Sequence, residues 1–115
     1  MRLFVYGSLL SGETHAARLG TCRLVGPART AARYTLVDLG PYPGLLEGGT
    51  TSVAGEVYEV DADTLAALDA FEGHPDEYRR RPVELLGESS AEAYLLPPGR
   101  APHGRALAGG SWRAR

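Results

Sequence analysis

The sequence predicts an α+β fold in which a helix packs against a curved or closed sheet. Three observations support this prediction. Short stretches rich in aromatic and β-branched residues recur along the chain, one segment has strong helical character, and loops rich in glycine and proline lie between them. A chain of 115 residues suffices for one modest core, so we expect a single domain over residues 1–115.

Strands are expected where the aromatic and β-branched stretches occur, at residues 2–6, 23–28, 31–37, 53–60, 78–86 and 92–96. Glycine indicates a bend or bulge at Gly26-Pro27 and a bulge at Gly55. Residues 14–19 can form a short helix. Residues 38–49 contain four glycines and two prolines, which favours a loop.

The part of the chain after residue 96 is poor in residues that pack a core. We therefore expect residues 97–110 to form an irregular or mobile segment. Trp112 is a large apolar side chain near the end, and we expect it to hold the C-terminus against the body of the protein.

Residues 61–72 (DADTLAALDAFE) are predicted to form the main helix. Asp61 or Asp63 can cap its start, alanine and leucine favour helix in its interior, and Gly73 can end it.

Glu72 falls on the same helical stripe as Leu65 and Leu68, which must face the core. Its carboxylate should therefore point inward or along the edge of a cavity. Burial and the helix dipole both raise the pKa of such a carboxyl, as a general acid/base requires. Two alternatives stay open: Glu72 turns to solvent at a frayed helix end, or it pairs with an arginine of residues 79–81.

Three further features give weaker indications. Asp69 lies near the edge of the same stripe and is the second carboxylate candidate, although we expect it to be exposed. Residues 42–44 (Tyr-Pro-Gly) can form a rigid platform beside a site or a plain turn. Tyr78 can line a cavity or merely begin a strand.

Composition argues against several classes of protein. The formal net charge of −2 gives no support for a nucleic-acid-binding surface. Cys22 is the only cysteine, which excludes an internal disulfide, and no Cys/His grouping has zinc spacing. No apolar run suits a transmembrane helix or a signal peptide, so we expect a cytoplasmic protein. The absence of Lys, Ile, Asn and Gln suggests a GC-rich bacterial genome and, through the missing amides, a thermophile.

Five short segments together resemble one known family. They are YGSL after the first strand, YPG at residues 42–44, GEVYEV at 55–60, LDAFEG at 68–73 and YRR at 78–80. In this order they resemble the γ-glutamylcyclotransferase-like family, which includes AIG2-like proteins and γ-glutamylamine cyclotransferases. The resemblance extends over about residues 3–96.

The resemblance implies a small mixed β-barrel with flanking short helices and a cavity for a γ-glutamyl group. It assigns the catalytic role to Glu72. The loop of Tyr6, Gly7, Ser8 and Leu9 would present backbone N–H groups to the α-carboxylate of the substrate. The other residues that it places in the pocket are Tyr42, Pro43, Gly44, Tyr78 and Tyr94.

The implied reaction is attack of the α-amine of the substrate on its own γ-carbonyl, which gives 5-oxoproline and a free amine. One carboxylate can carry the proton from the α-ammonium to the departing amine, so no metal or cofactor is expected. The identity of that amine and the oligomeric state stay open.

Two other functions remain possible on the same fold. One is a binding module for a small carboxylate ligand, which would have no need of an inward-facing Glu72. The other is a structural or interaction domain with a remnant pocket. One departure from the family pattern is Gly110-Ser111-Trp112, where many bacterial members have Gly-Asp-Trp, so any role of that aspartate is absent here.

Overall fold

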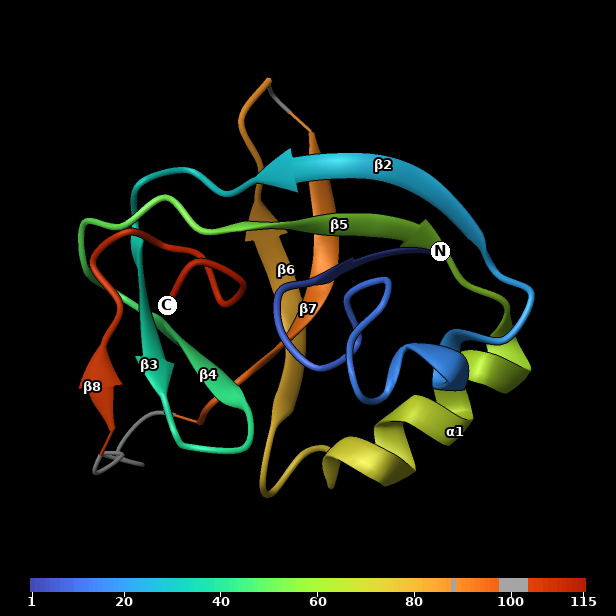
Figure 1. The fold of residues 1–115 in the computed structure, drawn as a ribbon. Coiled ribbons are helices and arrows are strands. Elements are labelled where there is room, and N and C mark those ends of the chain that lie inside the picture. The colour runs from blue at the N-terminus through green and yellow to red at the C-terminus, as the bar shows by residue number, and fades with distance from the viewer. Residues whose placement is uncertain (88, 98–103) are drawn as a thin grey trace.

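The computed structural model describes residues 1–87, 89–97 and 104–115, and this part of the chain forms two sheets and one α-helix (Figure 1). The larger sheet has the strand order β2-β5-β1-β7-β6 and the smaller one β4-β3-β8. The strands are β1 (Arg2–Val5), β2 (Arg23–Arg29), β3 (Tyr34–Asp38), β4 (Pro43–Glu47), β5 (Ala54–Glu59), β6 (Arg79–Glu84), β7 (Ser90–Leu95) and β8 (Arg105–Ala106). The helices are the 3-10 turn η1 (Ala16–Leu19) and α1 (Ala62–Glu72). The α+β class and the short helix are thus confirmed.

The two sheets are not closed, so the barrel that the resemblance implies is not confirmed. Strands β2 and β6 are the edges of the larger sheet. Within the described residues these two edges meet in one isolated bridge, between Thr30 and Leu85. A closed barrel needs a continuous ladder of backbone hydrogen bonds between its first and last strands, which a single bridge does not supply.

Part of the loop predicted over residues 38–49 is a strand. β4 pairs antiparallel with β3, and Leu45 is fully buried opposite Leu36. The prediction was wrong because glycine and proline dominate the local pattern, whereas burial against the rest of the protein decides whether a strand forms. The turn between the two strands is shorter than expected and is closed by a hydrogen bond from Leu39 N to Tyr42 O at 3.0 Å.

The irregular backbone in the larger sheet lies in β2, where the pairing with β5 shifts between Leu24 and Gly26. This shift confirms the expected irregularity there. Gly55 forms no bulge, because it pairs in register with β2. Glycine is needed at this position for a close approach of two strands, since a Cβ on residue 55 would lie 2.2 Å from the carbonyl oxygen of Val5.

The C-terminal part of the chain pairs first with the smaller sheet and then contacts the larger one. Residues 98–103 of the segment expected to be irregular lie outside the described residues. After them, β8 pairs with β3 and Leu107 is buried, so the expectation was wrong for this portion. The segment supplies an edge strand that sequence composition does not reveal. Trp112 is 3% exposed and belongs to the core, as expected.

Helix α1 forms as predicted. The side chain of Asp61 caps its start by accepting a hydrogen bond from Thr64 N at 2.7 Å, and the helix ends before Gly73. Leu68 is buried and Leu65 packs against the core. Figure 1 shows α1 and η1 side by side at one end of the larger sheet, so the last turn of α1 lies near the loop that leaves β1.

Candidate active site

A cavity of about 230 Å³ lies where the loop after β1 meets the end of α1 and the starts of β4 and β6. Most of the residues that the sequence predicts for a site line it: Tyr6, Gly7, Ser8, Leu9, Tyr42, Pro43, Glu72, Tyr78 and Tyr94. Gly44 is the exception among the predicted residues. It lies in β4, where a Cβ would meet Leu96 Cδ1 at 2.3 Å, and it does not line the cavity.

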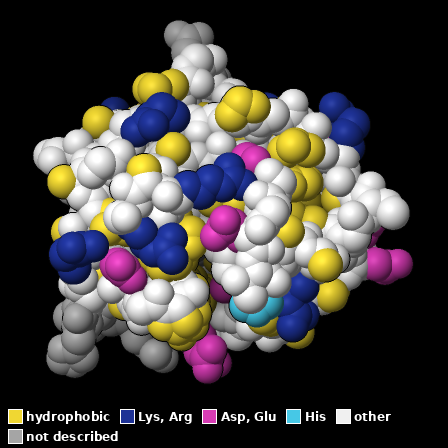
Figure 2. All heavy atoms as spheres, in the orientation of Figure 1, with side chains coloured by type: hydrophobic (Ala, Val, Ile, Leu, Met, Phe, Trp, Pro, Cys, Tyr) yellow, Lys and Arg dark blue, Asp and Glu magenta, His cyan; other side chains and the backbone are white. Residues whose placement is uncertain are grey.

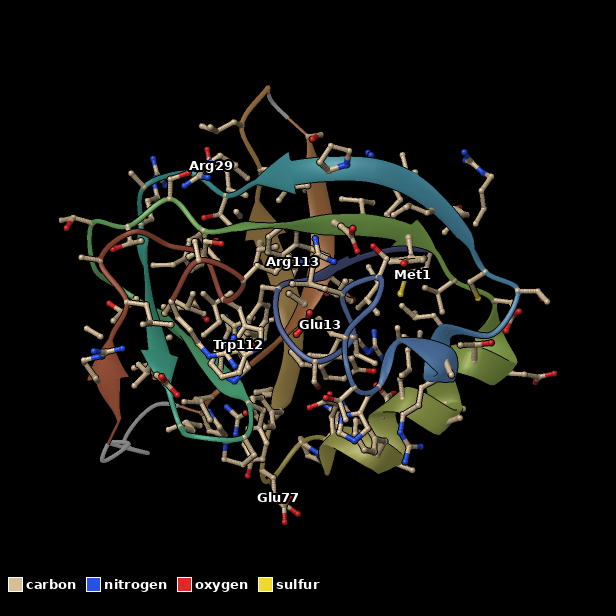
Figure 3. The ribbon with its side chains drawn as sticks, viewed as in Figure 1. Met1, Glu13, Arg29, Glu77, Trp112 and Arg113 are labelled. Atoms are coloured by element: carbon tan, nitrogen blue, oxygen red, sulfur yellow. The ribbon has the colours of Figure 1, made fainter. Side chains whose placement is uncertain are left out.

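The cavity wall also contains residues that the sequence did not single out. Phe71 directly precedes Glu72 on α1, and its position next to a candidate acid is the signal that could have found it. His15 lies in an irregular loop without any periodicity, and only the fold brings it to the cavity. Glu77 belongs to the rim, with its carboxylate projecting outward beyond the end of α1 (Figure 3).

The loop after β1 presents unused backbone donors to the cavity. The carbonyl groups of Gly7 and Ser8 accept hydrogen bonds from Leu10 N and His15 N, at 3.0 and 2.8 Å. The N–H groups of Gly7, Ser8 and Leu9, in contrast, donate to no group in the described part of the chain. Successive free N–H groups in a turn can bind an anion, so this loop is suited to a carboxylate.

Glu72 is the half-buried carboxylate of the cavity. Burial raises its pKa to about 7, against an opposing effect of the positive charge of Arg18 and with a smaller contribution from Glu77. Both the acid and the carboxylate are therefore populated at neutral pH, which is the condition for efficient proton transfer in either direction.

The two alternative positions considered for Glu72 are not formed. Its carboxyl lines the cavity instead of turning away from the helix end. Arg80 pairs with Asp69 at 3.0 Å and Arg81 pairs with Glu47 at 3.1 Å, and Arg79 forms no ion pair with Glu72 in the described part of the chain. Among the described residues no ion pair neutralises Glu72, so its carboxyl remains available to a ligand.

Three tyrosines hold the cavity wall together through their hydroxyl groups. Tyr6 donates to the carbonyl oxygen of Tyr94, Tyr78 donates to Pro43 O at 2.8 Å, and Tyr94 donates to Asp69 Oδ1 at 2.6 Å. Burial raises the pKa of all three phenols above the usual range, so they stay protonated at neutral pH. Each phenol thus joins two elements, which phenylalanine could not do.

Asp69 is a structural residue, contrary to the expectation that it is exposed. Its side chain is 24% exposed and forms a two-pronged ion pair with Arg80, with N–O distances of 3.0 and 3.2 Å. Arg80 also reaches Glu92 at 3.0 Å. Burial favours the neutral acid, but the hydrogen bonds from Arg80 and Tyr94 outweigh it and lower the pKa of Asp69. The helical periodicity placed Asp69 correctly near the edge of the inner stripe of α1. Its two partners lie on the strands β6 and β7, which the periodicity of α1 does not reveal.

We expect Asp69→Asn to lower the free energy of unfolding by about 2 kcal/mol at pH 7, because it breaks the pair with Arg80 and weakens the bond from Tyr94. The pKa of Asp69 is lower in the folded state, so its stabilisation is present above about pH 4 and is lost as the pH falls. Thermal unfolding from pH 3 to 8 tests this: the two curves should converge at low pH. Asp63→Asn, at an exposed position of the same helix, is the control. Equal stability of Asp69→Asn and wild type at pH 7 would contradict the expectation.

Ser111, the residue at which the sequence departs from the family pattern described above, lies outside the cavity. Its Oγ accepts a hydrogen bond from Ala114 N at 3.2 Å within the C-terminal turn. The neighbouring Arg113 reaches from this turn to Ser11 and to the buried Glu56, in front of the larger sheet (Figure 3). The serine therefore removes no carboxylate from the wall that contains Glu72.

The charged side chains form no single-sign patch on the face shown in Figure 2, where arginines and acidic residues are interspersed. In the described ranges, no group of three or more His, Cys, Asp or Glu side chains is placed to hold a metal ion. The helices of the described part are also too short or too polar to cross a membrane.

Comparisons with known proteins agree on one family. Residues 3–114 match the family described as "Gamma-glutamyl cyclotransferase, AIG2-like". A Vibrio cholerae protein is 51% identical over 82 residues, which are 71% of this chain and 70% of that protein. The gamma-glutamylcyclotransferase family protein YtfP of Escherichia coli K12 is 40% identical over 98 residues, 84% of this chain and 85% of the relative.

Two solved structures carry the same fold. The solution NMR structure of YtfP from Escherichia coli is 34% identical, covers both chains completely and has a TM-score of 0.73. The crystal structure of an AIG2-like protein from Mus musculus is 28% identical and has a TM-score of 0.79, with 93% of this chain and 85% of that one covered.

Proposed function

This chain belongs to the AIG2-like gamma-glutamyl cyclotransferase family, and we propose that it converts a γ-glutamyl amine or a related γ-glutamyl conjugate to 5-oxoproline and a free amine. The observation that carries the proposal is the carboxyl of Glu72, which lines a cavity opposite a loop with three unused N–H groups and has a pKa of about 7. An acid/base group and an anion-binding loop in one cavity suit a small substrate that carries both a carboxylate and a transferable proton.

In this proposal the loop of Gly7, Ser8 and Leu9 binds the α-carboxylate of the glutamyl group. No arginine lines the described cavity wall, so backbone dipoles and not a side-chain cation would neutralise this charge. The α-amine then lies within the same cavity as Glu72. Holding the glutamyl group folded brings its amine close to its own γ-carbonyl, which can contribute several kcal/mol through proximity.

The reaction then needs one proton carrier. Glu72, as the carboxylate, accepts a proton from the α-ammonium group. The freed nitrogen attacks the γ-carbon, the new C–N bond closes the five-membered ring, and the bond to the leaving amine breaks. Glu72 returns its proton to the leaving nitrogen, and then accepts the second proton that the ring nitrogen loses as it becomes the lactam N–H. This second proton passes to the released amine, which departs as an ammonium ion, so the enzyme ends in its starting state and the route requires no cofactor.

The pH dependence of activity should report on Glu72. We expect kcat/KM for a γ-glutamyl amine to rise with pH through a midpoint of about 7, because the carboxylate must be ionised to accept the α-ammonium proton. Below the midpoint the value should fall about tenfold per pH unit. Arg18 lowers the pKa of Glu72, so Arg18→Met should move the midpoint upward.

Arg18→Lys keeps the positive charge and is the matched control. Both variants retain an aliphatic stem over the ring of Phe71, where the Arg18 guanidinium lies 3.7 Å from the ring centroid. An unchanged midpoint in Arg18→Met would show that the titration does not belong to Glu72.

The direct test of the proposed function is release of 5-oxoproline from a panel of γ-glutamyl amines and γ-glutamyl dipeptides. Release from one class would support the cyclotransferase and identify the kind of leaving amine. If no compound releases 5-oxoproline but the protein still binds it, the enzymatic proposal is wrong and the chain is a small-carboxylate-binding module.

A further inference from the structure

Glu56 on β5 is a buried carboxylate that the proposed mechanism does not use. It is 8% exposed and does not line the cavity that contains Glu72. Burying a carboxylate costs free energy unless hydrogen bonds or a cation compensate it, and an apolar side chain of similar size often packs at least as well. Packing alone therefore gives no reason for a glutamate at this position.

Both carboxylate oxygens of Glu56 bond to a single residue, Ser11. Oε1 accepts a hydrogen bond from Ser11 N at 2.8 Å, and Oε2 accepts one from Ser11 Oγ at 2.7 Å. Hydrogen bonds to a charged acceptor are stronger than those between neutral groups. Two such bonds to one residue fix both its position and its orientation.

Glu56 thereby holds both ends of the loop after β1. Its backbone lies opposite Val5, the last residue of β1, in the antiparallel register of β1 and β5. Its side chain holds Ser11, where the loop ends. Residues 7–9, with the three unused N–H groups, lie between these two anchors. The direction of these N–H groups therefore depends on the contact between Glu56 and Ser11.

Arg113 brings the C-terminal turn to the same contact (Figure 3). Its guanidinium lies 3.6 Å from Glu56 Oε2, and it donates to the carbonyl oxygen of Ser11 and, at 3.3 Å, to Ser11 Oγ. The cation offsets part of the cost of burying the carboxylate. The N–H, hydroxyl and carbonyl groups of Ser11 are thus all engaged, whereas residues 7–9 keep free donors for a ligand.

We propose that Glu56 is a positioning residue for substrate binding, which acts through Ser11 to hold residues 7–9 in the geometry that binds the α-carboxylate. This inference rests on the proposed function. Glu56 does not line the cavity, so it takes no part in the proton transfer by Glu72. The α-carboxylate is bound alike in the substrate and in the transition state, so a displaced loop should raise KM and leave kcat nearly unchanged.

Glu56→Met nearly keeps the length of the side chain and removes both acceptors. We expect its KM to rise about tenfold, its kcat to stay within about twofold of the wild type, and the midpoint of its pH profile to stay unchanged. Ser11 is exposed and the Arg113 side chain is 44% exposed, so water can bond their freed groups and the variant should fold. Glu59→Met, the same change at an exposed position of β5, is the matched control and should keep the wild-type KM.

A double-mutant cycle tests whether Glu56 acts through Ser11. Ser11→Ala removes only the hydroxyl bond and should raise KM about threefold. In the Glu56→Met background it should change KM no further, because the contact is already lost. Ser11→Ala also leaves the buried carboxylate in place, so its effect on KM tests the same contact even where Glu56→Met lowers stability.

Two small probes give a readout that does not depend on turnover. 5-Oxoproline has the lactam ring and the carboxylate, and 2-pyrrolidinone has the same ring without the carboxylate. In NMR titrations, Glu56→Met should bind 5-oxoproline about tenfold more weakly than the wild type and bind 2-pyrrolidinone equally well. A variant that loses affinity for both probes to the same extent would have a damaged cavity, and the inference would be wrong.

The outcomes distinguish this inference from the function on which it rests. A Glu56→Met protein with the KM and the 5-oxoproline affinity of the wild type would overturn the inference and leave the cyclotransferase intact. Independent, additive effects of Glu56→Met and Ser11→Ala on KM would overturn the action through Ser11. A wild-type protein that neither binds nor releases 5-oxoproline would overturn the proposed function itself.

Discussion

The Glu72→Gln protein is expected to release 5-oxoproline about 10³-fold more slowly than the wild type while it still binds 5-oxoproline. Glutamine has nearly the same shape as glutamate but cannot accept the α-ammonium proton or return it to the leaving amine. No hydrogen bond or ion pair to another described residue holds the carboxyl of Glu72, so the substitution removes the proton carrier and little else. Single-turnover release of 5-oxoproline, together with its binding by calorimetry, measures both parts of the expectation.

Stability provides the control for this variant. The pKa of Glu72 rises on folding from 4.5 to about 7, so between these values the folded protein binds more protons than the unfolded chain. The free energy of unfolding therefore falls as the pH rises through that window. The loss is roughly 3 kcal/mol at most, and contact of the half-buried carboxyl with solvent makes it smaller. Glutamine avoids this cost. We expect Glu72→Gln to unfold at a higher temperature than the wild type at pH 8 and at the same temperature near pH 4.

An exposed carboxylate outside the cavity gives a matched comparison. Within the described residues, the one ion pair of Glu59 on β5 is with the N-terminal ammonium group, and Glu59→Gln should retain wild-type turnover. If Glu72→Gln keeps turnover within tenfold of the wild type, the proton is carried by another group and the assignment of Glu72 is wrong.

Gly7→Ala should damage both binding and stability. A Cβ on residue 7 would lie 2.4 Å from Cγ and 2.6 Å from Cδ of Pro43, so the loop and β4 cannot keep their present contact. Overpacking of this size costs about 1–3 kcal/mol. Displacement of the loop by a fraction of an ångström also moves the three free N–H groups, and we expect kcat/KM to fall about 100-fold, mainly through KM.

The matched control is Gly109→Ala, because a Cβ at residue 109 meets no atom within 4 Å. This variant should lie within about 0.5 kcal/mol of the wild type and keep its KM. Urea unfolding and initial rates distinguish the two glycines. A Gly7→Ala protein with the KM of the wild type would show that the loop does not need its contact with Pro43 to bind substrate.

The order of apolar residues and glycines along the chain was sufficient to predict the parts of the site that lie on helices and strands or directly beside them. The stripe of Leu65 and Leu68 placed Glu72 on the inner face of α1, because a helix has a fixed angle per residue. The end of β1 is followed by Gly7, against which the ring of Pro43 packs closely, and a glycine at the end of a strand is also a local signal.

Other parts of the molecule depend on partners that are distant in the sequence. β4 became a strand because Leu45 is buried against β3 and β7, although its own composition favours a loop. Asp69 is held by Arg80 from β6 and Tyr94 from β7, and nothing within α1 indicates either partner. His15 reaches the cavity through an irregular loop, where no periodicity exists to predict the direction of a side chain.

Two of the three tyrosine hydroxyl bonds lie on the inner side of the cavity, away from its rim at Tyr42. Tyr94 accepts from Tyr6 and donates to Asp69, so β1, β7 and α1 are fastened together around the region that would receive the glutamyl group. At the rim, Tyr42 is 44% exposed, and its hydroxyl group bonds no other residue in the described part of the chain. In the proposed function, substitutions at the rim can therefore change which amine is released, while Tyr6, Asp69 and Tyr94 keep their hydrogen bonds. Related enzymes of this design should diverge in their leaving groups before they diverge in their chemistry.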